Sequence, residues 1–202
     1  MMIDELIYRY RLLLYRISKA RYDLFTDLTH EHLIDRTERG GVSETVASAS
    51  RMIHGIDGPK RRGDGIAILV SEFENNNDAE AAAALGATYA WIFSDKLQSM
   101  EWYANCVKAG GWCANFPLGR YLNSVDVDVD FRRKHDLADS AEEHFQRAIT
   151  HGHIYAKIHL ARLHTQEGRM SRMRFWATTV PLAWPLLKLI SKDKFDPRIR
   201  AV

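Results

Sequence analysis

A recurring pattern of small and large residues constrains the fold more than any other feature of this sequence. In one version a small residue, two large residues and another small residue stand at offsets of 0, 3, 4 and 7, and in the two best copies a helix-stopping glycine follows at offset 11. The copies, the first being faint, are Ile66, Leu69, Val70, Phe73 and Asn77; Ser99, Trp102, Tyr103, Cys106 and Gly110; Ala141, His144, Phe145, Ala148 and Gly152; and Arg172, Phe175, Trp176, Thr179 and Ala183. Offsets of three and four place residues on one face of a helix, so the pattern predicts repeated helices.

A second pattern precedes three of these segments, at offsets of 0, 4, 5 and 8. Its copies are Ala81, Leu85, Gly86 and Tyr89; Ala114, Leu118, Gly119 and Leu122; and Ala156, Leu160, Ala161 and His164. A small residue beside a large one allows two helix backbones to approach closely while the large side chain fills the groove. Helix pairs with such faces bury them by stacking on one another, so we expect an all-α fold of antiparallel helix pairs.

These patterns resemble the Sel-like repeat family, a bacterial-rich branch of the tetratricopeptide repeat superfamily. The resemblance covers residues 64–183 and is strongest from Ala81 to Gly110. It is weaker later: Tyr121 stands one position early, Leu118 to Leu160 spans 42 positions where Leu85 to Leu118 spans 33, and the third copy has Ala161 for Gly. The resemblance implies a right-handed helical-repeat solenoid. Its implied repeat-core residues are Leu85, Gly86, Tyr89, Trp102, Tyr103, Leu118, Gly119, Phe145, Leu160 and Trp176.

Two segments flank the expected repeats. Residues 1–63 are interpreted as an N-terminal helical region that caps them, with one long helix over the first 35 residues and a second helix from Ser43 to about His54. Residues 184–202 are interpreted as a basic, apolar tail that follows a stretch interrupted by Pro181 and Pro185. Within the repeats, residues 125–130 alternate Val and Asp, which indicates a loop or a short strand.

Composition and charge indicate an ordinary soluble protein with one unusual end. The chain is 46% hydrophobic and 27% charged, and its net charge of +2 gives no reason to expect nucleic acid binding. Residues 169–202 carry +6 and the rest carries −4, which indicates a solvated basic tail or contact with an acidic partner surface or anionic lipid. The apolar stretch with Trp184 and flanking Lys188 and Lys192 indicates burial against the last repeat or a partner, or peripheral membrane contact through residues 176–200. Acidic residues follow the first methionines, and no run reaches the ~20 apolar residues of a membrane span, so we expect a cytoplasmic protein.

The family resemblance implies that the first helix of each pair lines a concave groove where partners bind. The groove residues it indicates are Phe116, Arg120, Asn123, Tyr155, Arg162 and Thr165. Arg120 and Arg162 occupy the same repeat position, so the two guanidinium groups could clamp a carboxylate or phosphate. The alternative is a pair of surface arginines in weak ion pairs.

Metal, cofactor and catalytic motifs find little support. His151, His153, His159 and His164 lie close in sequence but match no zinc spacing, and the Asp126, Asp128, Asp130 triplet lacks the turn glycine of a calcium loop. We therefore expect no metal, no cofactor and no catalytic residues. The leading hypothesis is a non-catalytic scaffold or adaptor for a protein or peptide, its oligomeric state left open.

Two rival functions remain. One is a hydrolase in the groove acting on a cell-wall or sugar substrate, for which Glu80, Cys113 and Thr165 are the candidates by position. The other is a peripheral membrane organiser that uses the basic, amphipathic termini.

Overall fold

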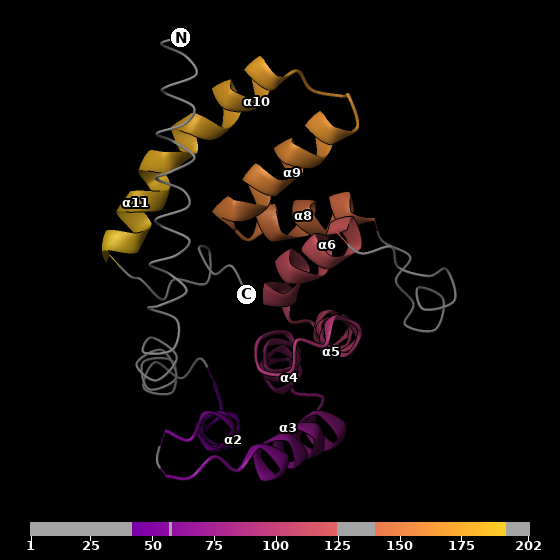
Figure 1. Cartoon of the computed structure of the whole chain (residues 1–202), viewed down its shortest axis with the longest axis vertical. Coiled ribbons are helices and arrows are strands. Elements are labelled where there is room, and N and C mark those ends of the chain that lie inside the picture. Colours follow the sequence, from indigo (N-terminus) through magenta and orange to yellow (C-terminus); the bar gives the residue numbers. More distant parts are fainter. Residues whose placement is uncertain (1–41, 57, 125–139, 193–202) are drawn as a thin grey trace. The chain divides into compact units, whose positions relative to one another are not determined.

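The structure, a computed structural model, describes residues 42–56, 58–124 and 140–192, and every regular element in these ranges is a helix (Figure 1). The elements are α2 (Glu44–His54), α3 (Arg62–Asn76), α4 (Ala79–Trp91), α5 (Lys96–Lys108), η1 (Trp112–Ala114), α6 (Asn115–Ser124), α8 (Ala141–Thr150), α9 (Ile154–Gln166), α10 (Arg172–Thr179), η2 (Val180–Leu182) and α11 (Ala183–Lys192). The all-α prediction is thus confirmed over these ranges. The expected helix at residues 1–35 and the loop at 125–130 lie outside them.

Side-chain caps fix where most of these helices begin. Ser43 accepts a hydrogen bond from the Val46 amide at 3.2 Å, so α2 starts and ends where the sequence predicted. Asp78, Asp95 and Ser171 cap α4, α5 and α10 in the same way. Such caps satisfy amides that the first helical turn leaves without partners.

The described residues fall into two compact units, 42–65 and 66–192. In the first unit, α2 ends at Gly55, whose φ of 72° is the left-handed conformation that glycine adopts most easily. The start of α3 lies against α2 at Gly65, where an added Cβ atom would come within 2.6 Å of the Ala49 carbonyl oxygen. A glycine is therefore needed for this close approach.

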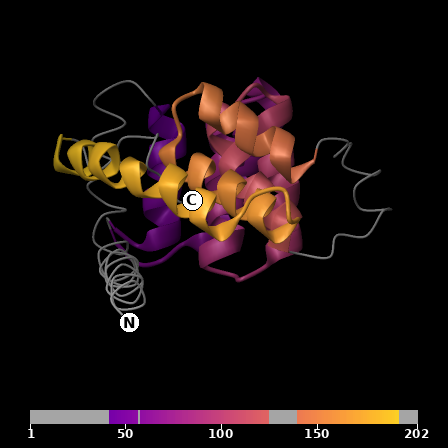
Figure 2. The same ribbon diagram turned by 90° about the horizontal axis from the view of Figure 1, so that it is seen from above.

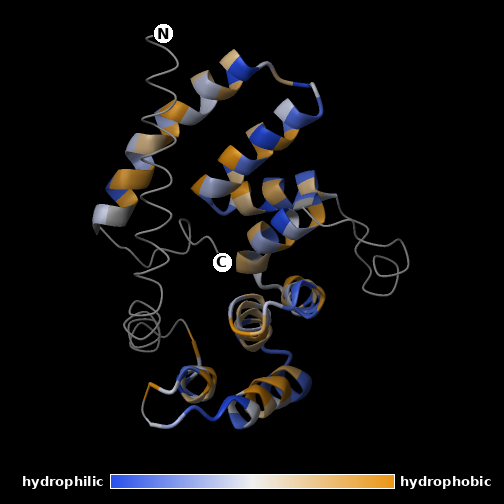
Figure 3. Cartoon of the chain, in the orientation of Figure 1, coloured by the Kyte–Doolittle hydropathy of each residue, from blue (hydrophilic) through white to orange (hydrophobic). Residues whose placement is uncertain are grey.

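The second unit is built from helices that pack on their neighbours in chain order. α4 packs on α5, α5 on α6, α6 on α8, α8 on α9 and α9 on α10 (Figures 1 and 2). One core cluster is centred on Tyr103 and Leu118, and the next on Phe116 and Phe145. Apolar residues run along most of α4 and α11, as Figure 3 shows.

Corresponding repeat positions make the same contact in the first two helix pairs. A Cβ atom added at Gly86 would lie 2.7 Å from the Tyr103 ring, and one added at Gly119 would lie 2.9 Å from the Phe145 ring. The aromatic ring of the second helix thus rests on the glycine of the first helix in both pairs. Both second helices are also followed by a left-handed glycine, Gly110 at φ 89° and Gly152 at φ 82°. In these two pairs the glycine, the ring and the final glycine therefore take corresponding places.

The third pair departs from this arrangement. Ala161 stands where the first two pairs have glycine, and the chain does not turn at Ala183 but continues from α10 through η2 into α11 (Figure 2). Pro181 lies in η2, the 3-10 turn that separates α10 from α11, so the expected interruption occurs there. Pro185 lies in the first turn of α11, which accepts a proline. Leu186 of α11 packs on Ile154 of α9. The first part of the expected tail is thus a packed helix.

No helix in the described part of the chain has both the length and the apolar content needed to cross a membrane.

Candidate functional site

Arg120 on α6 and Arg162 on α9 both act electrostatically on the half-buried side chain of His159. Both arginines are exposed, and His159 lies beside Leu160 on α9. Burial first, and then the charges of Arg120, Arg162 and His153, lower the pKa of His159 from 6.5 to about 4. Both arginines therefore lie within electrostatic range of one imidazole. We call Arg120, His159 and Arg162 the arginine face.

Aromatic rings form the floor of the arginine face. Phe116 stacks on His153 at a centroid distance of 4.3 Å and meets His159 edge-on at 5.2 Å. The guanidinium carbon of Arg120 lies 5.8 Å from the Phe116 centroid, within range of a cation–π interaction. These contacts hold Arg120 over the rings, so part of the orientation that an arginine needs to bind an anion is already fixed.

Phe116 itself is a core residue, contrary to its expected place in the groove. Its side chain is 1% exposed, because the rings of Phe145, His153 and His159 and apolar side chains of α8 and α9 pack around it. The sequence pattern misplaced it because these neighbours come from elements distant in the sequence. Phe116 can support a ligand only through the residues that it holds.

The other expected groove residues differ in how accessible they are. Asn123 is exposed near the end of α6. Tyr155 is half-buried and packs beside Leu182 and Leu189 against the pair formed by Ile154 and Leu186. The Thr165 hydroxyl donates to the Ala161 carbonyl oxygen at 2.8 Å, within its own helix. Asn123 is therefore the one of these three whose whole side chain is open to solvent.

The chemistry of the arginine face suits anion binding. Two permanent positive charges flank an imidazole that is neutral at pH 7, and the walls around it are aromatic. A carboxylate placed there would exchange water for charge-assisted hydrogen bonds in a partly apolar setting.

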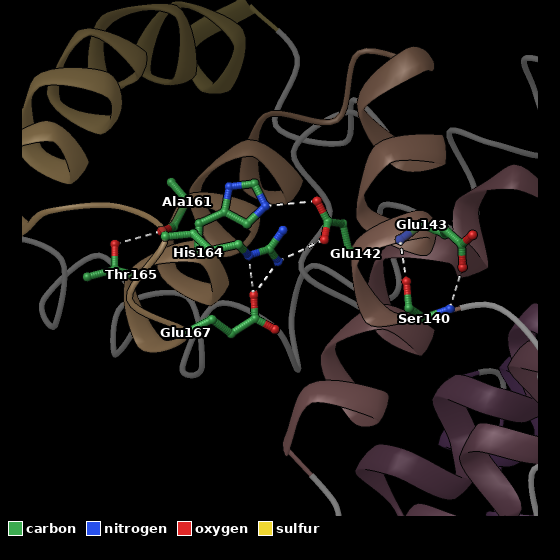
Figure 4. Close-up of polar contacts among 8 residues, drawn as sticks. Ser140, Glu142, Glu143, Ala161, His164, Thr165 and Glu167 are labelled. Atoms are coloured by element: carbon green, nitrogen blue, oxygen red, sulfur yellow. Dashed lines mark hydrogen bonds and ion pairs between the residues drawn. The ribbon is translucent and has the colours of Figure 1, made fainter.

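A second polar cluster ties α8 to α9 and was not found from the sequence (Figure 4). His164 Nε2 lies 2.9 Å from Glu142 Oε1, and Arg169 Nη2 donates to Glu142 Oε2 at 2.8 Å and also to Glu167. The hydrogen bonds from Arg169 and then His164 lower the pKa of Glu142. The signal in the sequence was His164 itself, a polar residue at a position where the repeat has an aromatic one.

A shallow cavity of about 250 Å³ adjoins this cluster, between α8, α9 and α10. Its lining is Ile149, Lys157, Leu160, Ala161, His164, Met170 and Thr178. In the first two pairs an aromatic ring rests on a glycine, whereas Ala161 lines an opening in the third.

The two cysteines lie together, although they are seven positions apart in the sequence. A hydrogen bond from Cys113, burial and the nearby charge of Glu80 raise the pKa of the Cys106 thiol. Neither cysteine forms a disulfide bond. Glu80 and Cys113, two of the hydrolase candidates, both act on the Cys106 thiol, while Thr165 lies on α9.

The histidines have separate partners. His151 stacks on Trp112 at 5.0 Å, His153 caps α9 through Nδ1, and His144 Nδ1 lies 2.9 Å from Asn115 Oδ1. In the described ranges no three side chains of His, Cys, Asp or Glu converge as metal ligands would.

Comparisons with protein-family models, with curated proteins and with solved structures found no match.

Proposed function

We propose that this protein is a non-catalytic scaffold of Sel-like repeats that binds an acidic segment of a partner protein across the arginine face. The observation that carries the proposal is the shared action of Arg120 and Arg162 on His159. Two arginines from successive helix pairs, at the same repeat position, are suited to pairing with carboxylates spaced along an extended peptide.

The repeated contacts support the Sel-like part of the proposal. Tyr103 on Gly86 and Phe145 on Gly119 are equivalent contacts in successive pairs, which is how stacked repeats bury their faces. A right-handed stack of this kind would place α4, α6 and α9 along one surface. Two cysteines that form no disulfide bond suit a reducing compartment, so we propose that the scaffold works in the cytoplasm.

The test uses a random peptide library displayed on phage and selected on the full-length protein. Peptides that bind are expected to be enriched in Asp and Glu, because the arginine face offers two guanidinium groups and a neutral imidazole. The Arg120→Glu plus Arg162→Glu protein is expected to select Lys and Arg instead. This reversal reports on the sign of the charge at the site, which a general loss of binding would not.

The matched control is Lys96→Glu plus Lys108→Glu, two exposed cations on α5. It changes the net charge by the same amount and should leave the preference for acidic peptides unaltered. The proposal fails if the selected peptides show no excess of acids, or if both double variants shift the preference equally.

A further inference from the structure

Large apolar side chains are exposed on the outer face of α10, η2 and α11, which form nearly one continuous helical run (Figure 2). These side chains are Met173 at 83%, Val180 at 50%, Trp184 at 75% and Leu187 at 48%. Their successive spacings of seven, four and three place them in one stripe, which we call the outer stripe. Large apolar side chains left exposed in a row indicate a binding surface.

The opposite face of the same run already has its partner. Thr179 and Leu186, seven positions apart, are buried, and Leu186 packs on Ile154 of α9. Leu182 and Leu189, also seven apart, are half-buried beside them. Folding of the second unit therefore buries one apolar face of α11, and the outer stripe stays exposed and able to contact another molecule.

The charges along the run indicate what kind of surface the outer stripe binds. From Arg169 to Lys192 the sequence holds five cationic residues and neither Asp nor Glu. Arg172, Arg174 and Lys188 are exposed on the run. Lys188 follows Trp184 by four positions, which sets it directly beside the outer stripe, and Arg172 and Arg174 stand on either side of Met173. An apolar stripe whose charged neighbours along the run are all cations fits an anionic surface.

A second copy of the chain is a poorer fit for the outer stripe. Pairing two such stripes would bring like charges together without the acidic residues that helix pairs use to offset them. An exposed tryptophan in an apolar stripe with cations at its borders is instead the composition of helices that lie in the interface of a membrane.

We infer that the outer stripe docks the protein on the surface of an anionic lipid bilayer, with Met173, Val180, Trp184 and Leu187 inserted and the cations at the phosphate level. The run lies along the bilayer rather than across it, since its inner face stays packed on α9. This inference does not rest on the arginine face and stands or falls separately from it.

Flotation of the full-length protein with vesicles tests it. Vesicles of phosphatidylcholine containing about one-third phosphatidylserine should carry the protein upward, and vesicles of phosphatidylcholine alone should carry at least about tenfold less. Met173→Ser plus Trp184→Ser should lower binding to the anionic vesicles about tenfold. Arg174→Glu plus Lys188→Glu should do the same at physiological salt.

Two matched controls separate the stripe from bulk properties. Phe93→Ser plus Leu97→Ser removes two exposed apolar residues elsewhere, and Lys96→Glu plus Lys108→Glu makes the same charge change on α5. Both should float like the unaltered protein. Equal flotation with neutral and anionic vesicles, no flotation of the folded protein, or unchanged flotation of the stripe variants would each overturn the inference. So would a stripe variant that alters only the oligomeric state measured by light scattering.

Discussion

At the scale of single residues, the arginine face depends on a histidine that stays neutral. His159 is enclosed by Phe116 and Phe145 and stands near two permanent positive charges, and both effects disfavour the imidazolium form. The lowered pKa keeps positive charge on the arginines alone at neutral pH. It also makes the folded protein sensitive to acid at this position.

The sign of this sensitivity follows from the two pKa values. His159 has a pKa of about 4 when folded and near 6.5 when unfolded, so between these values the unfolded chain binds more protons. Stability is therefore lost as pH falls from 6.5 toward 4, by about 2–3 kcal/mol in total from this group. Denaturant unfolding of the unaltered protein and of His159→Phe at pH 7 and pH 4.5 should show the smaller loss in the variant. Equal losses would mean that His159 titrates normally in the folded state.

At the scale of helices, the pairs are held together by rings resting on glycines. The Phe145 ring is fully buried, and a Cβ atom at Gly119 would lie 2.9 Å from it and 3.2 Å from the Ala141 carbonyl oxygen. Neither neighbour can retreat without moving α8. The interface between the two helices therefore has room for glycine only.

We expect Gly119→Ala and Gly86→Ala each to destabilise the protein by about 1–3 kcal/mol, because overpacking forces the facing ring and its helix to shift. Gly63→Ala is the control, since nothing lies within 4 Å of a Cβ atom there, and it should be neutral or stabilising by up to about 1 kcal/mol. Thermal unfolding followed by circular dichroism measures all three. A Gly119→Ala protein as stable as Gly63→Ala would show that α6 and α8 are further apart than described.

These glycines also show what the sequence could reveal. A repeated Leu-Gly pair in the first helix and a ring at a fixed position within the second helix predicted the helices and a close approach of their backbones, because helix packing leaves a periodic trace. The distance between glycine and ring is not fixed in the sequence, since Gly86 to Tyr103 spans 17 positions and Gly119 to Phe145 spans 26. Phe116 was misplaced because its burial comes from rings on two other helices, α8 and α9. The Glu142–His164–Arg169 cluster joins α8, α9 and the turn after α9 at no fixed spacing, so His164 alone marked it in the sequence. The cysteine pair was missed for a similar reason, since a turn at Gly111 brings it together.

At the scale of the second unit, packing in chain order means that each helix depends mainly on its two neighbours. The first two pairs have an aromatic ring fully buried against the facing helix, at Tyr103 and Phe145. In the third pair the residues facing α10 line an opening of about 250 Å³, and Trp176 is half-buried. Stability in a stack of this kind is close to a sum of local and nearest-neighbour contributions, so it is not uniform along the chain.

The end formed by α10, η2 and α11 should therefore open before the rest of the unit. In hydrogen exchange followed by mass spectrometry, amides of α10 are expected to exchange faster than those of α5 and α8, through an opening that depends little on low denaturant concentrations. Gly119→Ala weakens the α6–α8 interface, so it should speed exchange in α6 and α8 far more than in α10. Exchange of all these helices through one denaturant-dependent opening would instead mean that the contact between Leu186 and Ile154 couples the terminal run fully to the unit. In that case the opening in the third pair would not lower the local stability of α10 and α11.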